Sequence, residues 1–576
     1  MLKRLLVRMT LLAAFVGGLC LELQGLSAAQ VHPSAAFDSS STADEKSAGD
    51  NEQIPPNQAK LDEMIDRMIK REHVEIAAFD LYTPIIETYI QEVRINQLTG
   101  AVPKSDYYFL GQADFQGRPK VHSMTASSKK GSFLWSFDPA GFLQMIYIDR
   151  GQLDRAHYHF TYSRREFLGD VRCIRFEVSP TTKARGPRFV GDIWVEDQDY
   201  TIVRINGTYA PAIHFSWKQV EDEYYVHFDS WRTNVKSGLW LPSYVYSQEI
   251  HRPTLFGNPS YKSSTHLWGY KLKRASREEE LSRLLVESAN QVKDEATQHD
   301  RSPLEAQHEW RHEAENTVLE VLEKNGLLAP AGEVDKVLNT IVNNLEVTNN
   351  VDEQIDLRCR VLLTGNLEMF SVGNTIVLSR RLIDVVPNEE TLAALIAHGM
   401  ADAMLPKPNQ DQYGFSDILR LSPTEVLRRL SFEEGKIESA QNNEKALELL
   451  KKSPYASKLG NAGLFLKQLH LQARELKQLI NPQLGNEIFF ASQSLQAAPA
   501  LEPANKGQVS ALPMGSRLKI DPWSAVVTLM ESKPMTLLSG RDKMPFAVTP
   551  LVPYLTRYVE ISASHPGSDE AIGFNQ

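Results

Sequence analysis

The stretch that decides the fold runs from residue 358 to residue 404. It contains two short apolar runs, RCRVLL at 358–363 and NTIVLS at 374–379, and then LAALIAHGMADAM at 392–404. The first two runs have the length and the branched side chains of buried strands, whereas the third is long enough for a helix. Because an apolar helical pattern at 334–345 precedes them, these segments predict the order helix, strand, strand, helix.

One face of the last helix carries two polar side chains among apolar ones. Leu395, His398, Asp402 and Leu405 are spaced i, i+3, i+7 and i+10, so they form one stripe on a helix. The spacing predicts that His398 and Asp402 point inward together. There an imidazole and a carboxylate can form a hydrogen bond with each other.

This region resembles a known family. Residues 368–383 read EMFSVGNTIVLSRRLI, and the loop PNEE at 387–390 leads to LAALIAHGMAD at 392–402. The wording is similar to the core of the gluzincin zinc metallopeptidases of the HtpX and BepA type. In that core a strand with the phrase N-A-F-x-x-x-G-x-I-x-V-x-x-G-L-L precedes a helix A-x-x-x-A-H-E-x-x-H. The resemblance covers roughly residues 310 to 460, and it places the strand at 375–378 at the edge of a cleft, where an extended peptide could pair with it.

The residues that carry the family's chemistry are mostly replaced. The resemblance implies three metal-ligand positions, which are His398, Asp402 and Ser439 in this chain. It also places Gly399 at the position of the general base and Asn443 at the position of the family's aspartate. Glu438 lies one residue away from the third ligand position. Glycine cannot accept a proton, and removing a general base typically costs about 10²- to 10⁴-fold in rate. We therefore expect a vestigial site kept for packing, with no cofactor, and residual metal binding as the alternative.

The helix that carries Ser439 has its own start signal. Ser431 is followed three residues later by Glu434, which is the pattern of a capping box. The pattern predicts that the helix begins near residue 431.

A complete zinc-protease motif lies elsewhere in the chain. Residues 308–312 read HEWRH, in which His308 and His312 share one helix face and Glu309 lies beside the first histidine. Arg311 and the polar run at 305–316 favour a solvated helix instead. An active zinc endopeptidase that uses this motif, or a remodelled site at His398, remains the alternative, and it would require zinc.

The N-terminal half has the period of strands. Between residues 82 and 266, alternating aromatic and branched residues are interrupted by turn signals such as Asn206-Gly207 and 236–238, which predicts a large antiparallel sheet or open barrel. The segments RFVGDIWVED at 188–197 and TIVRI at 201–205 resemble the lipoprotein carrier LolA, a half-barrel with an apolar cavity. The resemblance implies an acyl-binding concavity lined by aromatic residues, whereas the residues by themselves favour ordinary sheet core. These residues are Trp194, Trp217, Tyr225 and Trp240.

The first residues have the pattern of an export signal. The basic residues Lys3, Arg4 and Arg8 precede an apolar run at 9–21, and LSAA at 26–29 suits cleavage after Ala29. We expect a periplasmic or secreted protein that does not span the membrane once the signal is removed. Residues 30–60 are rich in Ser, Asp, Glu and Pro, which predicts a disordered tether.

Composition sets further limits. The 576 residues are 42% hydrophobic and 23% charged, and the net charge is -10, which argues against nucleic acid as a partner. Cys173 and Cys359 remain after export, so they form either one disulfide or two buried free thiols, and a cysteine-based metal site is excluded.

We expect an α+β protein with an N-terminal antiparallel β half-barrel followed by a mainly helical metallopeptidase-like domain. The expected segments are a signal peptide at 1–29, a tether at 30–60, a LolA-like domain at 61–275, a helical domain at 276–500 and a strand-bearing extension at 501–576. The expected function is binding or scaffolding, with an extended peptide or an unfolded or acylated envelope protein as partner. Lipid or lipoprotein carriage by the β domain alone is the third alternative.

Overall fold

The computed structural model describes most of the chain after residue 56, within the compact unit Gln53–Gln576. Among the described residues, no helix is both long enough and apolar enough to cross a membrane. The described residues are 57–96, 100–117, 119–124, 139–181, 188–210, 225–250, 260–272, 315–351, 355–405, 427, 430, 432, 435–482, 484–495, 498–501, 518–530 and 546–558.

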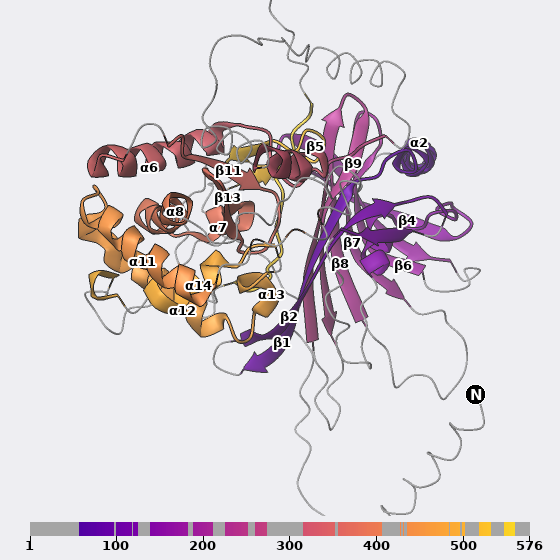
Figure 1. Cartoon of the computed structure of the whole chain (residues 1–576). Coiled ribbons are helices and arrows are strands. Elements are labelled where there is room, and N and C mark those ends of the chain that lie inside the picture. Colours follow the sequence, from indigo (N-terminus) through magenta and orange to yellow (C-terminus); the bar gives the residue numbers. More distant parts are fainter. Residues whose placement is uncertain are drawn as a thin grey trace, which may run out of the picture. The chain divides into compact units, whose positions relative to one another are not determined.

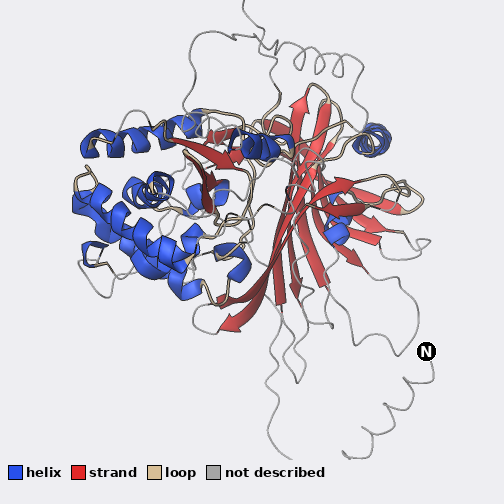
Figure 2. Cartoon of the chain, in the orientation of Figure 1, coloured by secondary structure: helices blue, strands red, loops and turns tan. Residues whose placement is uncertain are grey.

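A ten-stranded sheet fills the N-terminal half, as the alternating pattern predicts. Its order is β3-β2-β1-β10-β9-β8-β7-β6-β5-β4, and each adjacent pair is antiparallel. Figure 2 shows these strands in red beside one another. The predicted antiparallel sheet is therefore confirmed. The strands are β1 Ile85–Asn96, β2 Gly100–Asp114, β3 Lys120–Ser123, β4 Tyr158–Leu168, β5 Val171–Pro180, β6 Arg188–Glu196, β7 Ile202–Ala210, β8 Tyr225–Lys236, β9 Leu239–Ile250 and β10 Ser260–Trp268.

Helix α2 (Gln58–Phe79) covers one face of this sheet. Asn57 caps it by accepting a hydrogen bond from the Lys60 N–H. Its apolar side chains join the inward residues of the strands in one buried cluster. Arg232 of β8 donates two hydrogen bonds to Glu72 of α2, at 2.6 and 2.7 Å, so a buried ion pair fixes the helix to the sheet.

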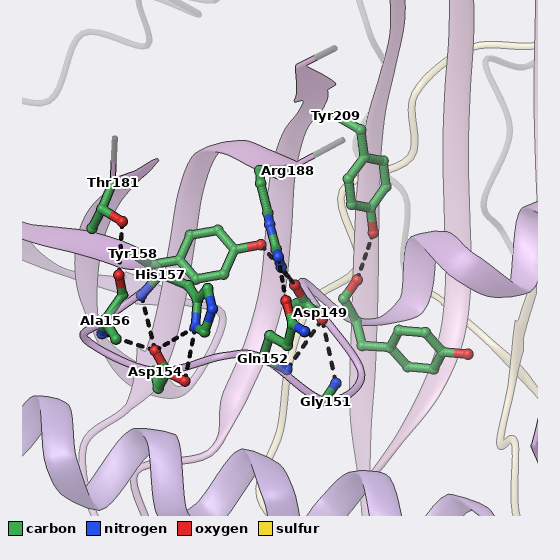
Figure 3. A network of polar contacts seen from close by, with 11 residues as sticks. Asp149, Gly151, Gln152, Asp154, Ala156, His157, Tyr158, Thr181, Arg188 and Tyr209 are labelled. Carbon is green, nitrogen blue, oxygen red and sulfur yellow. Dashed lines mark hydrogen bonds and ion pairs between the residues drawn. The ribbon is translucent and has the colours of Figure 1, made fainter. Parts of the chain in front are cut away.

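A polar network holds the loop that connects η2 to strand β4 (Figure 3). The short helices before this loop are α3 (Pro139–Leu143) and η2 (Gln144–Ile146). Asp149 accepts hydrogen bonds from the Tyr158 hydroxyl at 3.2 Å and from Arg188. Asp154 accepts from the backbone N–H groups of residues 156 and 157. Arg155 reaches back to Asp62 and Asp66 of α2. The network therefore orders the loop against α2.

The opposite face of the sheet holds the two tryptophans that were expected to line a lipid cavity. Trp194 and Trp240 belong to a second buried cluster, whereas their neighbours Ile193, Val195 and Leu241 belong to the cluster beneath α2. Successive side chains of a strand point to opposite faces, so these tryptophans do not line the surface that α2 covers. Of the other two expected residues, Trp217 lies outside the described residues and Tyr225 begins β8.

One predicted turn is wrong. Asn206-Gly207 lies inside β7, and Gly207 pairs with Gly191 of β6. A Cβ at Gly207 would meet the Phe189 ring at 2.7 Å. The glycine therefore makes room for an aromatic ring, and a dipeptide pattern cannot distinguish that role from a turn. The turn predicted at 236–238 is confirmed, because Gly238 has a φ of 65° between β8 and β9.

Helices dominate the chain from residue 333 to residue 501, as the sequence predicts. The predicted order helix, strand, strand, helix is confirmed as α6, β11, β13 and α8, and a short strand, β12, lies between the two predicted ones. The bounds are α6 Glu333–Asn349, β11 Arg358–Leu362, β12 Met369–Val372, β13 Thr375–Ser379, α7 Arg380–Val385, α8 Glu389–Met404, α11 Lys436–Lys451, η4 Ala456–Lys458, α12 Leu459–Gln472, α13 Lys477–Ile480, α14 Glu487–Ser494 and η6 Pro499–Leu501.

Strand β13 is not an edge strand, contrary to the expectation from the family resemblance. The small sheet has the order β11-β13-β12, with β13 parallel to β11 and antiparallel to β12. Both hydrogen-bonding edges of β13 are therefore used within the chain. All four residues of β12 are buried, and Phe370 stacks on Phe432 with ring centroids 4.3 Å apart.

The C-terminal extension contributes a small hairpin of β14 (Leu518–Ile520) and β15 (Val527–Leu529). Cys173 and Cys359 are buried free thiols, so the disulfide alternative is not the one found.

Candidate functional site

Helix α8 carries the centre of the expected site. Its N-cap Asn388 accepts hydrogen bonds from the backbone N–H and the hydroxyl of Thr391, and Glu389 and Glu390 occupy the first turn, where negative charge favours a helix. The helix is buried from Thr391 to Asp402. A helix buried on all sides lies in the core, which explains why its sequence is apolar almost throughout.

His398 faces helix α14 rather than solvent. Its imidazole is 0% exposed, and Nδ1 lies 3.7 Å from Oε2 of Glu487. Glu487 is the first residue of α14 and is itself 2% exposed. The structure thus brings a carboxylate from nearly ninety residues downstream to the histidine.

Asp402 and Ser439 lie between α8 and α11, as the resemblance implies. Asp402 accepts a hydrogen bond of 2.9 Å from the Asn442 side chain. On α11, the Asn443 amide donates to the Ser439 hydroxyl at 3.4 Å. The predicted hydrogen bond between His398 and Asp402 stays a prediction, because the contacts described here lead to Glu487 and Asn442. Figure 1 shows α8 in red next to α11 and α14 in orange.

Gly399 has no room for a side chain. A Cβ placed on it would lie 2.7 Å from Cγ2 of Ile376 on β13, well inside ordinary contact distance. The Ser371 hydroxyl of β12 donates to the Gly399 carbonyl at 3.3 Å, which holds the helix close to the small sheet. The space that a side chain at position 399 would need is therefore occupied by Ile376 of the neighbouring strand.

The start of α11 shows which residue of this helix points into the core. The helix begins at Lys436, and the backbone N–H of Gly435 donates to the Glu438 carboxylate at 3.0 Å. The start predicted near Ser431 and Glu434 is therefore wrong, since it lies one turn too early. Glu438 caps the helix and Ser439 is the residue that points into the core, at 1% exposed.

The donor set does not match a catalytic zinc site. Such a site needs three good ligands and an open position for water. Here the side chains are one imidazole, carboxylates already engaged with Asn442 and close to His398, and a neutral hydroxyl. Among the described residues, no group of three or more His, Cys, Asp or Glu side chains is placed to hold a metal. We derive no chemical step through zinc.

A further buried carboxylate lies next to the small sheet. Burial, together with the nearby charge of Glu87, raises the pKa of Glu368 to about 8, although the hydroxyl of Thr364 opposes the shift by donating a hydrogen bond to the carboxylate. Glu87 of β1 is paired with Arg380 of α7 at 2.6 Å and accepts from the Tyr108 hydroxyl at 2.7 Å. This group of charges joins the large sheet to the helical region.

Two residues that contact the expected site residues, Asn442 and Glu487, were not predicted from the sequence. Ser439, Asn442, Asn443 and Ala446 are spaced i, i+3, i+4 and i+7, so the pattern of α11 alone could have identified Asn442 as an inward residue. Glu487 gave no such signal, because nothing in its local sequence relates it to His398.

The alternative motif at His308, Glu309 and His312 lies outside the described residues.

Comparisons with known proteins add little to this geometry. No family model matches the chain, and no curated protein matches it. Among solved structures, a protein of the DUF1329 family from Desulfovibrio piger is similar over 37% of this chain and 95% of its own length. The identity is 10% and the TM-score is 0.20, so this similarity carries no argument.

Proposed function

We propose that the chain is a non-catalytic relative of zinc metallopeptidases that works by binding or scaffolding. The observation that carries the proposal is the contact between Gly399 and Ile376. A catalytic base at position 399 would need the space that the isoleucine occupies, and glycine itself cannot accept a proton.

The burial of the cluster supports the same proposal. His398, Asp402 and Ser439 are 0%, 3% and 1% exposed, and a peptide carbonyl must come within contact distance of a catalytic group. Buried polar side chains that bond one another can stabilise a core without any reaction. The proposal treats this cluster as the structural remainder of an active site.

The proposed setting is the cell envelope. It rests on the basic residues, apolar run and small-residue cleavage site of the first 29 residues. The proposed partner is an extended peptide or an unfolded or acylated envelope protein. Lipid carriage by a half-barrel gains no support from Trp194 and Trp240, because they pack in the cluster on the other side of the sheet from α2.

Proteolysis of unfolded casein tests the proposal. We expect no cleavage by the mature protein, with or without added zinc, and less than one zinc per chain by elemental analysis. Cleavage that a chelator abolishes and that is lost in His398→Ala would overturn it. If His308→Ala removes the cleavage instead, the motif at 308–312 is the active site and the proposal also fails.

A further inference from the structure

Residues 546–558, here called the C-terminal strap, cross the face of the large sheet opposite α2. The strap reads FAVTPLVPYLTRY and contains no helix or strand. Pro550 and Pro553 lack a backbone N–H and hold their neighbours in extended conformations. Phe546, Val548 and Leu555 are buried in the same cluster as Trp194 and Trp240. The strap is drawn in yellow in Figure 1.

The first half of the strap is clamped by one side chain. The Gln91 amide of β1 donates to the Phe546 carbonyl at 2.7 Å and accepts from the Val548 N–H at 2.8 Å. These two bonds recognise main-chain groups, so they do not depend on the strap's side chains. Gln91 is fully buried and also donates to the Tyr89 hydroxyl at 3.1 Å, so without the strap its amide would lose two of its three partners, and unsatisfied buried polar groups are costly. The sheet therefore carries a polar group that needs an extended chain against it.

The other half of the strap is bound at the turn between β4 and β5. The Asp170 N–H donates to the Leu555 carbonyl at 2.8 Å, and the Asp170 carboxylate accepts from the Tyr554 hydroxyl at 2.7 Å. Gly169 has a φ of 67°, and a Cβ on it would lie 2.6 Å from the Leu555 nitrogen. The turn is therefore shaped to let another backbone come close.

The end of the strap meets complementary charge. Arg557 pairs with the buried Glu196 of β6, and Asp197 lies 3.7 Å from the same guanidinium. The N–H of Tyr558 donates to the Asn234 side chain of β8 at 2.6 Å. In contrast, Val552 and Tyr554 are 66% and 53% exposed. The strap is thus held at its two ends and is exposed in its middle.

We infer that this face of the sheet is a binding site for an extended segment of another protein chain, and that the C-terminal strap is its resident ligand. The inference rests on the proposed binding function and names the surface and the partner for it. The partner is an unfolded segment with an apolar-x-apolar pair, a leucine about seven residues later and an arginine two residues beyond, as in Val548, Leu555 and Arg557. Main-chain recognition by Gln91 and Asp170 supplies affinity, and Glu196 selects a basic end.

Release of the strap in the full chain tests this inference. Leu555→Asp places a charge at a position that is 1% exposed, so we expect the strap to leave the sheet. A fluorescent peptide FAVTPLVPYLTRY is then titrated and followed by anisotropy. We expect it to bind the variant at least about tenfold more tightly than the wild type, whose site is occupied by its own strap.

The matched control is Val552→Asp, which puts the same charge at an exposed position of the strap and should bind no better than the wild type. Adding Gly169→Ala to Leu555→Asp should abolish peptide binding, because the turn would no longer admit the backbone. Where Leu555→Asp fails to fold by circular dichroism, Arg557→Glu releases the strap from the surface instead.

A folded release variant that does not bind the peptide would overturn the inference, and so would a release variant that binds it no more tightly than the wild type and the Val552→Asp control do. Both outcomes are independent of casein cleavage, which tests the proposed function. The two proposals can therefore fail separately.

Discussion

The sheet region and the helical region treat buried carboxylates differently. In the sheet region, Glu72 receives two hydrogen bonds from Arg232, which also donates to the Ile146 carbonyl. In the helical region, Glu487 lies 3.7 Å from an imidazole and Asp402 is bonded by a neutral amide. Glu72 is therefore paired with a full positive charge through two hydrogen bonds, whereas Asp402 is bonded by an uncharged side chain.

The difference teaches what each group is for. A buried ion pair with its hydrogen bonds satisfied acts as a crosslink between two elements, and it becomes costly when one partner is removed. A cluster of neutral and mixed partners around His398 has no such single crosslink. Helix α8 is buried from Thr391 to Asp402, so apolar packing surrounds this group.

The largest effect is expected in the sheet region. Arg232→Met leaves Glu72 buried without its guanidinium and beside Glu75, so the free energy of unfolding should fall by about 3–5 kcal/mol. Urea unfolding measures the loss. In the double variant Arg232→Met, Glu72→Leu, most of that loss should be recovered. If the single and double variants are equally destabilised, the ion pair is not the crosslink described here.

A second effect is a pH dependence from the helical region. The pKa of Glu368 is raised to about 8 from an ordinary 4.5, so the folded state holds its proton more tightly than the unfolded state. This contribution is complete below pH 4.5 and is lost as the pH rises through 8. Glu75 and Asp106, with pKa values raised to about 7 and about 6, act in the same direction.

Glu368→Gln should remove the part of this pH dependence that comes from Glu368. We expect the unfolding free energies of variant and wild type to diverge by about 4 kcal/mol between pH 5 and pH 9, with the variant favoured at the upper end. Parallel curves for the two proteins would show that Glu368 is not the titrating group.

A third effect tests the packing around Gly399. Gly399→Ala gains helix propensity of about 1 kcal/mol but brings a methyl group against Ile376, and overpacking of this kind costs about 1–3 kcal/mol. We expect a net loss of about 1 kcal/mol in thermal unfolding. In a double-mutant cycle with Ile376→Ala, the two changes should couple favourably, and additivity would contradict the contact.

The smallest effect concerns the register of α11. Glu438→Ala removes the carboxylate that accepts from the Gly435 N–H, and the loss of such a cap costs about 0.5–1 kcal/mol. Exposed Glu444→Ala, one turn and a half further along the helix, is the matched control and should change stability less. A change in metal content in Glu438→Ala would instead place Glu438 in the site.

Much of the site could be predicted from local sequence. The helical spacing of His398 and Asp402 placed both on the inward side of α8, and the resemblance placed Ser439 opposite them on α11. Glu487 could not be predicted, because it reaches His398 only through the packing of α14 on α8. The role of Gly399 as a contact for Ile376 also depends on a neighbouring strand.

The sequence by itself determined the elements and their division into a strand-rich half and a helix-rich half, because hydrophobic period is a local property of the chain. It did not determine which strand lies at an edge, since pairing is a property of two segments and β13 turned out to be central. It also could not distinguish Asn206-Gly207 in a strand from the same pair in a turn. Only the tertiary structure decided that the C-terminal strap lies on the sheet, because an extended segment with two prolines has no local preference for the surface that receives it.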